Sequence, residues 1–324
     1  MVQQTTHSVV RRFVRCVIVA ASIGLFWLPS ARAARIPAAL QRERGLVVFV
    51  GFPADELLAS VRADREGLVQ VLVARGDRGE AEASMRLSAT GHDMALGGRT
   101  TVLEYDGRHL PYCDNSVNGI VLASPTQVPR DELMRVLAPR GTLVTADGKT
   151  EEKPWPGEMD EWTHYLHDAT NNAVADDTLV GPPDRLRWIG APDHVRHHNF
   201  LASVSTMVSA NGRLFTIVDE GSLVSPYLPA NWVLSARDAF NGITLWKKRI
   251  PDWAPTLRDF RSGPAEIGRR MVAVGDEVFV TLGFEAPVSV LDAATGNEKA
   301  VLHGTKGAEE VLVAVSYTHL TLPT

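Results

Sequence analysis

The sequence has few cysteines, no strong excess of charge and no long hydrophobic run. Only Cys16 and Cys113 occur among its 324 residues, so there is no disulfide framework and no C-x-x-C-H haem motif. The net charge is -5 and the basic residues are scattered, whereas nucleic-acid-binding proteins gather Lys and Arg in a stripe or patch. We therefore expect no nucleic-acid partner, and core packing has to supply the stability.

The N-terminal segment has the three parts of a secretory signal peptide. Arg11, Arg12 and Arg15 precede the apolar run 16–28, and the small-residue site Ala31-Arg32-Ala33 follows it. This combination is typical of exported proteins. The run is shorter than the about 20 residues of a membrane-spanning helix, which favours cleavage over retention as an anchor. The pattern predicts a signal peptide over residues 1–34, a periplasmic or secreted protein, and no stable membrane span after cleavage.

The last ten residues look foreign to the rest of the chain. Residues 315–324 read VSYTHLTLPT and resemble a translated adapter from a sequencing library. They also interrupt a strand pattern partway. We leave them out of the fold prediction, as one would a fusion scar, and expect the natural protein to continue beyond Ala314.

Residues 40–150 alternate short apolar runs with helical patterns. The runs predict strands at 46–50, 69–74, 101–104, 119–123 and 142–145, and the helical patterns lie at 54–63 and 131–137. Apolar strands that alternate with helices indicate a parallel sheet covered on both faces. The sequence predicts a Rossmann-like α/β domain.

Two motifs in this domain resemble those of class I S-adenosylmethionine (SAM)-dependent methyltransferases. Residues 110–118 (LPYCDNSVN) are similar to the family's LPF-DNSFD turn, and residues 133–141 (LMRVLAPRG) to its RVLKPGG turn. The resemblance implies a SAM pocket at Gly51, Asp77 and Asp106, with Asp106 on the adenine side. The first loop, however, has one glycine followed by Phe52 and Pro53, and Arg75 stands near the place of the family's acidic residue. The sequence thus argues against SAM binding and favours a degenerate copy of the fold.

Residues 151–200 form a junction dense in histidine and acidic residues. If residues 160–169 are helical, Glu161, His164 and His167 share one face, and His197 or His198 could complete a metal site. The alternative is that these histidines hydrogen-bond to aspartates and carbonyl groups. No H-E-x-x-H spacing is present, so both interpretations stay open.

Residues 201–314 have closely spaced strand patterns and an internal repeat. A D-A-x-x-G pattern at Asp238 and Gly242 recurs 54 residues later at Asp292 and Gly296, and each copy follows a similar hairpin pattern. No helical pattern intervenes, so we expect an all-β region. A multi-strand repeat of this length is typical of β-propellers.

The motif A-x-D-A-x-x-G-x-x-x-W, ending at Trp246, resembles the tryptophan-docking repeat of pyrroloquinoline-quinone (PQQ)-type propellers. That resemblance implies the first blades of an exported PQQ-like propeller, with Trp246 packed between blades. It makes a binding or scaffold module in the cell envelope the first hypothesis, with a protein or polysaccharide partner. A PQQ-dependent alcohol or sugar oxidoreductase with calcium is the alternative, and a SAM-dependent methyltransferase the second alternative.

Overall fold

The computed structural model describes residues 40, 45–53, 67–79, 81–82, 99–179, 181, 186–192, 204–225, 227–254, 265–314 and 317–321. The predicted signal peptide, the helix predicted over residues 54–63, and His197 and His198 lie outside these residues and stay predictions. Within the described residues, no helix is long and apolar enough to cross a bilayer.

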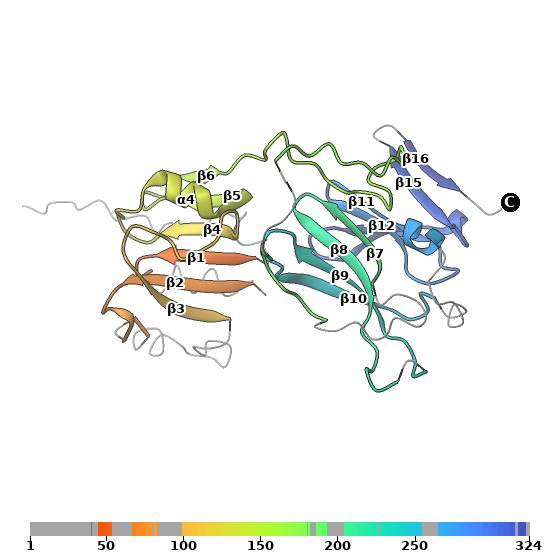
Figure 1. Cartoon of the computed structure of the whole chain (residues 1–324), viewed down its shortest axis with the longest axis horizontal. Helices are drawn as coiled ribbons and strands as arrows, with labels where there is room; N and C mark the ends of the chain where they lie inside the picture. The colour runs from red at the N-terminus through yellow and green to blue at the C-terminus, as the bar shows by residue number, and fades with distance from the viewer. Residues whose placement is uncertain are drawn as a thin grey trace, which may run out of the picture. The chain divides into compact units, whose positions relative to one another are not determined.

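A six-stranded sheet forms the N-terminal domain (Figure 1). Its strands are β1 (Leu46–Val50), β2 (Leu68–Ala74), β3 (Thr100–Tyr105), β4 (Val117–Leu122), β5 (Leu137–Val144) and β6 (Thr150–Glu152). The order is β3-β2-β1-β4-β5-β6, parallel except for β6, which pairs antiparallel with β5. The prediction of a Rossmann-like α/β domain is confirmed, and the antiparallel edge strand β6 is an addition to it.

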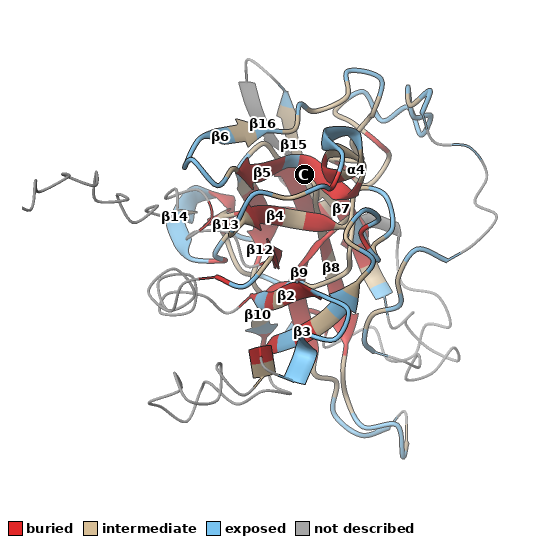
Figure 2. Cartoon of the chain, turned by 90° about the vertical axis from the view of Figure 1, so that its left-hand side faces the viewer, coloured by how far each residue is buried: buried red, intermediate tan, exposed pale blue. Residues whose placement is uncertain are grey.

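The apolar runs form strands because both faces of the sheet are buried. Val47 and Phe49 belong to one apolar cluster, and Val48 and Val50 belong to another, and all four are at most 1% exposed. Successive side chains in a strand point to opposite faces, so an uninterrupted apolar run supplies both clusters. Figure 2 shows the buried residues of β4 and β5 in red.

The helix α4 (Arg130–Val136) joins β4 to β5. Leu133 and Val136 are buried against the sheet, while Asp131 and Glu132 stand in the first turn, where the helix dipole favours negative charge. The helix ends at Leu137, which has extended backbone angles and begins β5.

The described chain after residue 203 is all-β apart from two 3-10 segments, η2 (Ala265–Arg270) and η3 (His303–Thr305). One antiparallel sheet has the order β10-β9-β8-β7, a second has the order β11-β12-β13-β14, and β15 pairs with β16. The strands are β7 (Val204–Ala210), β8 (Arg213–Asp219), β9 (Trp232–Asp238), β10 (Thr244–Ile250), β11 (Met271–Val274), β12 (Glu277–Thr281), β13 (Val288–Asp292), β14 (Glu298–Leu302), β15 (Glu310–Ala314) and β16 (Tyr317–Thr321). The all-β region is therefore present, but these sheets do not show a closed propeller.

The two copies of the D-A-x-x-G pattern form hairpins of the same kind. The Asp238 carboxylate accepts hydrogen bonds from the amides of Phe240 and Asn241 (2.8 and 3.0 Å). The Asp292 carboxylate accepts the corresponding bonds from Ala294 and Thr295 (3.2 and 2.9 Å). In each hairpin the aspartate carboxylate thus accepts hydrogen bonds from turn amides.

A tryptophan covers the glycine of each hairpin. The indole of Trp188 donates to Ala239 O and lies over Gly242, and the indole of Trp246 donates to Ala293 O and lies over Gly296; both bonds are 3.0 Å. Both glycines have positive φ, +75° and +72°, which a residue without Cβ adopts readily. Trp246, on β10, therefore packs one sheet against the hairpin of the next.

Three consecutive junction residues each accept a backbone hydrogen bond from a different β strand. The bonds run from Ser209 N in β7 to Trp162 O (2.7 Å), from Ala273 N in β11 to Thr163 O (3.0 Å), and from Val313 N in β15 to His164 Nε2 (3.1 Å). This segment is not a helix, contrary to the arrangement considered for residues 160–169. His167 has a left-handed φ of 72° and forms an isolated bridge with His164.

Candidate functional site

A cavity of about 500 Å³ lies at the carboxyl edge of the parallel sheet. Its lining comes from the ends of β1 to β4 and the segments that follow them. The lining residues are Gly51, Phe52, Val73, Ala74, Asp77, Ala81, Tyr105 and Ser124. The strand order reverses between β1 and β4, and open α/β sheets bind ligands in the crevice at such a switch point. The volume is in the range of small-molecule sites.

Gly51, which has no side chain, leaves the backbone at the end of β1 open to the cavity. It follows β1 with a φ of +89° and donates its amide to Leu72 O at 2.9 Å. A Cβ here would come within 2.7 Å of Ser124 Oγ. Any larger residue would therefore strain the backbone and displace the Ser124 hydroxyl, which lines the same cavity.

Asp77 presents a carboxylate to the cavity after the turn that ends β2. Its amide donates to Ala74 O (3.2 Å), and its carbonyl accepts from Ala81 N (3.0 Å). Glu104 in β3 holds the same turn by accepting from Gly76 N at 3.1 Å. Within the described part of the chain, the exposed Asp77 carboxylate has no hydrogen-bond or ion-pair partner, so it is available to a ligand hydroxyl.

Two aromatic side chains complete the cavity wall. Tyr105 ends β3 and packs partly against the apolar cluster beneath it. Phe52 follows Gly51 and is 41% exposed. Aromatic faces stack on flat heterocycles, so the cavity combines a carboxylate, an aromatic wall and a close backbone approach.

Asp106, the third residue predicted for this pocket, is not among the lining residues and is held in its own turn. Its carboxylate accepts from the amides of Arg108 and His109 (2.8 and 2.7 Å) and lies 2.8 Å from His109 Nδ1. These bonds, first of all that from the His109 amide, lower the pKa of Asp106 well below its ordinary value. The structure therefore brings Gly51 and Asp77 together but not Asp106.

The 110–118 turn is fastened to α4 by Arg135. The guanidinium donates to Glu132 and Asp114 (2.7 and 2.6 Å) and to Tyr112 O (3.0 Å). These hydrogen bonds indicate that the 110–118 motif has a structural role. Cys113 in the same turn is exposed.

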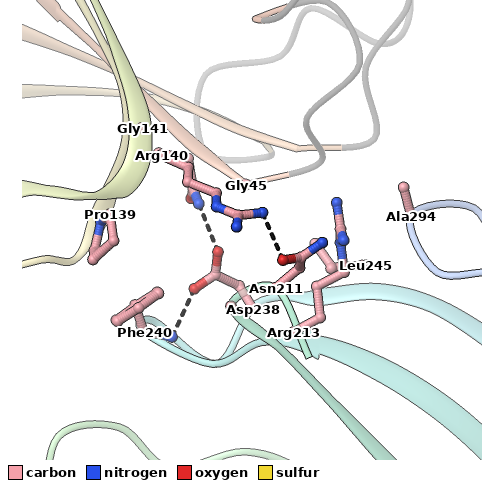
Figure 3. Close-up of a pocket in the computed structure, with 12 residues that line it drawn as sticks. Gly45, Pro139, Arg140, Gly141, Asn211, Arg213, Asp238, Phe240, Leu245 and Ala294 are labelled. Carbon is pink, nitrogen blue, oxygen red and sulfur yellow. Dashed lines mark hydrogen bonds between the residues drawn. The ribbon is translucent and has the colours of Figure 1, made fainter. Parts of the chain in front are cut away.

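A smaller cavity of about 110 Å³ lies at the amino edge of the sheet, where the β7–β8 and β9–β10 hairpins contribute to its lining (Figure 3). Asn118 of β4 donates to Asp238 at 2.6 Å and accepts from Asn241 Nδ2 and Leu46 N, both at 2.8 Å. Arg140 donates to Asn211 at 2.6 Å, as Figure 3 shows. The polar groups at this edge are engaged with one another, which indicates a structural interface.

The junction histidines make hydrogen bonds to the protein. His164 is 3% exposed; its Nε2 accepts from Val313 N, so Nδ1 carries the proton that is donated to Thr163 Oγ1 at 2.7 Å. His167 Nε2 lies 2.6 Å from Asp160 Oδ2. Among the described residues, no three or more His, Cys, Asp or Glu side chains are grouped to hold a metal ion.

Comparisons with known proteins find methyltransferases among solved structures. They include a protein from Methanococcus maripaludis assigned as a SAM-dependent methyltransferase (18% identity), a SAM-dependent methyltransferase from Aquifex aeolicus (21%) and the Haloferax volcanii complex of the Trm112 methyltransferase activator with its assigned methyltransferase (24%). The alignments cover 32, 32 and 33% of this chain and 49, 56 and 49% of those chains, each with a TM-score of 0.26. The chain thus spans about half the length of these structures, and the likeness identifies no substrate.

No protein-family model matches the chain, and no curated protein matches it. The quinoprotein interpretation of the sequence is corrected: the solved structures found are methyltransferases, and nothing found supports a PQQ-type propeller. Three predictions depended on that interpretation and are corrected with it: the envelope scaffold function, the PQQ-dependent oxidoreductase activity, and PQQ with calcium as cofactors. The D-A-x-x-G pattern misled because an acceptor side chain and a glycine with positive φ are common in turns of unrelated folds.

The conclusion against SAM is corrected as well, because two of the solved structures found are themselves named as SAM-dependent methyltransferases. Sequence reasoning weighed the sparse glycines and Arg75, and it missed Tyr105, Ser124 and Ala81. A signal for Tyr105 and Ser124 existed, because each stands at or just after the carboxyl end of a predicted strand.

Proposed function

We propose that this protein is a SAM-dependent methyltransferase and that its α/β domain binds SAM in the carboxyl-edge cavity. The observation that carries the proposal is the convergence of Gly51, Asp77 and Tyr105 in one cavity at the switch point of the sheet. These residues come from the ends of three different strands, which is how α/β folds assemble nucleotide sites.

The residues present fit the nucleoside part of the cofactor. Asp77 would accept hydrogen bonds from the ribose hydroxyls, and Tyr105 would stack on the adenine. Gly51 would admit the ligand close to the backbone between β1 and β4. When bound, SAM supplies an electrophilic methyl group, and the chain's own residues orient it and exclude water. Asp106 takes no part, because its turn occupies both carboxylate oxygens.

Calorimetric titration of the chain with SAM and with S-adenosylhomocysteine tests this function. We expect saturable binding that Asp77→Asn weakens about 10-fold or more, because a hydrogen bond to a charged group contributes about 1.5–3 kcal/mol. Tyr105→Ala should weaken binding to a similar degree through lost stacking. Asp131→Asn, at a carboxylate on α4 that is also exposed, is the matched control and should bind as the unmodified chain does.

The absence of binding to both ligands at millimolar concentration would overturn the proposal. Equal affinity of the Asp77→Asn and Asp131→Asn variants would place the ligand elsewhere on the chain.

We also propose that residues 1–34 direct export. A fusion of these residues to a reporter that is active only outside the cytoplasm should be active and processed near Ala33. Deletion of the apolar run 16–28 should abolish that activity, and an active reporter without the run would contradict export.

A further inference from the structure

Two buried side chains beside the β11–β12 pair carry polar atoms that no group among the described residues satisfies. Arg270 is 7% exposed and Thr281 is fully buried. Arg270 Nε and Thr281 Oγ1 have no hydrogen-bond partner within the described part of the chain. A buried polar atom without a partner costs free energy, and in native proteins it commonly marks a bound water, ion or functional group.

Both atoms belong to the same end of one strand pair. Met271 at the start of β11 pairs with Val280 of β12. Arg270 is the last residue of η2 and directly precedes Met271, and Thr281 is the last residue of β12 and directly follows Val280, so both residues lie at the same end of the β11–β12 pair. A residue with a cationic donor and a residue with a hydroxyl therefore stand at the same end of one strand pair.

Arg270 lacks the counter-ion that a buried guanidinium needs. Its Nη1 donates to Phe284 O at 2.8 Å, and its Cζ lies 4.8 Å from the centre of the Phe284 ring. No carboxylate of the described residues lies within ion-pair distance of it. The neighbouring Arg269, by contrast, pairs with Glu310 at 2.6 Å.

The missing counter-ion matters because Arg270 carries a positive charge. Burial lowers the pKa of Arg270, and the charge of Glu309 acts in the opposite direction. Arginine nevertheless stays protonated in proteins. A buried cation is costly unless an anion pairs with it, and a bound anion would supply that charge.

We propose that Arg270 and Thr281 form a binding site for an oxyanion, a carboxylate or a phosphate group. One ligand oxygen would accept from Arg270 Nε and from the Thr281 hydroxyl, with the Phe284 ring against the guanidinium. The site lies in the β region and is independent of the SAM cavity.

Thermal unfolding of the chain in phosphate, in acetate and in chloride at equal ionic strength tests the site. We expect one of the two oxyanions to raise the Tm by about 5 °C at 100 times its Kd, relative to chloride. A response to phosphate alone identifies a phosphate ligand, and a response to acetate a carboxylate ligand. Equal Tm values in all three salts would overturn the proposal.

Thr281→Val separates specific binding from general stabilisation by salts. The variant removes an unsatisfied hydroxyl, so its Tm in chloride should equal or exceed that of the unmodified chain, and its affinity for the oxyanion should fall about 10-fold. Thr216→Val is the control, because the Thr216 hydroxyl lies 2.9 Å from Ser235 Oγ; it should lower the Tm and leave the response to the oxyanion unchanged. Full retention of that response in Thr281→Val would contradict the assignment, even if Arg270 variants fail to fold.

Discussion

The two edges of the parallel sheet differ in how their polar groups are used. At the amino edge, Asn118 joins β4 to Asp238 and Asn241, more than 100 residues away. At the carboxyl edge, Asp77 and Ser124 line a cavity of about 500 Å³, and the Asp77 carboxylate makes no hydrogen bond or ion pair with another described residue. Satisfied groups hold a structure together, whereas groups left to solvent are free to bind a ligand. The first edge is therefore structural, and the second is the one available for chemistry.

The largest expected effect is at the amino edge, in the hairpin that reaches Asn118. Gly242→Ala would place a Cβ 2.5 Å from the Trp188 ring at a φ of +75°. Left-handed strain and the displaced tryptophan should together lower the free energy of unfolding by about 3 kcal/mol. Urea denaturation measures this, with Gly275→Ala as the control: Gly275 also has positive φ, but its Cβ would meet no atom within 4 Å. Equal losses in the two variants would show that the tryptophan contact contributes nothing.

A smaller loss is expected from Asn118→Asp. The new carboxylate would face the Asp238 carboxylate across a contact of 2.6 Å, and burial already raises the pKa of Asp238. We expect a loss of about 2 kcal/mol at pH 7. The loss should shrink at about pH 4, where the pair can share a proton. A loss that does not change between these pH values would argue against contact between residues 118 and 238.

The pH dependence of stability tests the burial of His164 in the junction segment. Burial lowers the pKa of His164 from its ordinary 6.5, so the unfolded chain binds this proton at a higher pH than the folded chain does. The stability that His164 contributes is therefore present above about pH 6.5 and is lost as the pH falls below it. His164→Gln should flatten this slope in Tm measured between pH 5 and 8. His303→Gln, at an exposed position, should leave the slope as it is.

The smallest effect on stability belongs to the carboxyl edge. Asp77→Asn should change the free energy of unfolding by less than about 0.5 kcal/mol, because an exposed carboxylate without a protein partner contributes little to folding. The same variant should lose ligand affinity, as stated above. Chemical denaturation of the ligand-free chain checks the predicted change in the free energy of unfolding. A loss above 1 kcal/mol would mean that Asp77, like the polar groups of the amino edge, stabilises the fold.

The strands of the α/β domain were predictable because their signals are local. The runs at 46–50 and 69–74 became β1 and β2 within a residue, since a strand buried on both faces is apolar at most of its positions. The edge strand β6 was missed, because Thr150–Glu152 is polar and forms a strand only through pairing with β5.

The candidate site was predictable only in part. Gly51 and Asp77 follow the first two predicted strands, so the end of a strand was a sufficient signal for them. Asp106 follows β3 in the same way, yet the Arg108 and His109 amides occupy its carboxylate. No strand pattern distinguishes a carboxylate that faces a cavity from one that caps its own turn.

Sequence alone determined where the apolar strands run and where hairpins turn, because continuous apolar runs and the turn chemistry of Asp and Gly involve neighbouring residues. Tertiary structure alone decided which strand ends meet in one cavity, which carboxylate stays free, and that Asn118 contacts Asp238. Those outcomes depend on the order of strands in the sheet, which brings distant residues together and leaves no mark on the residues next to them.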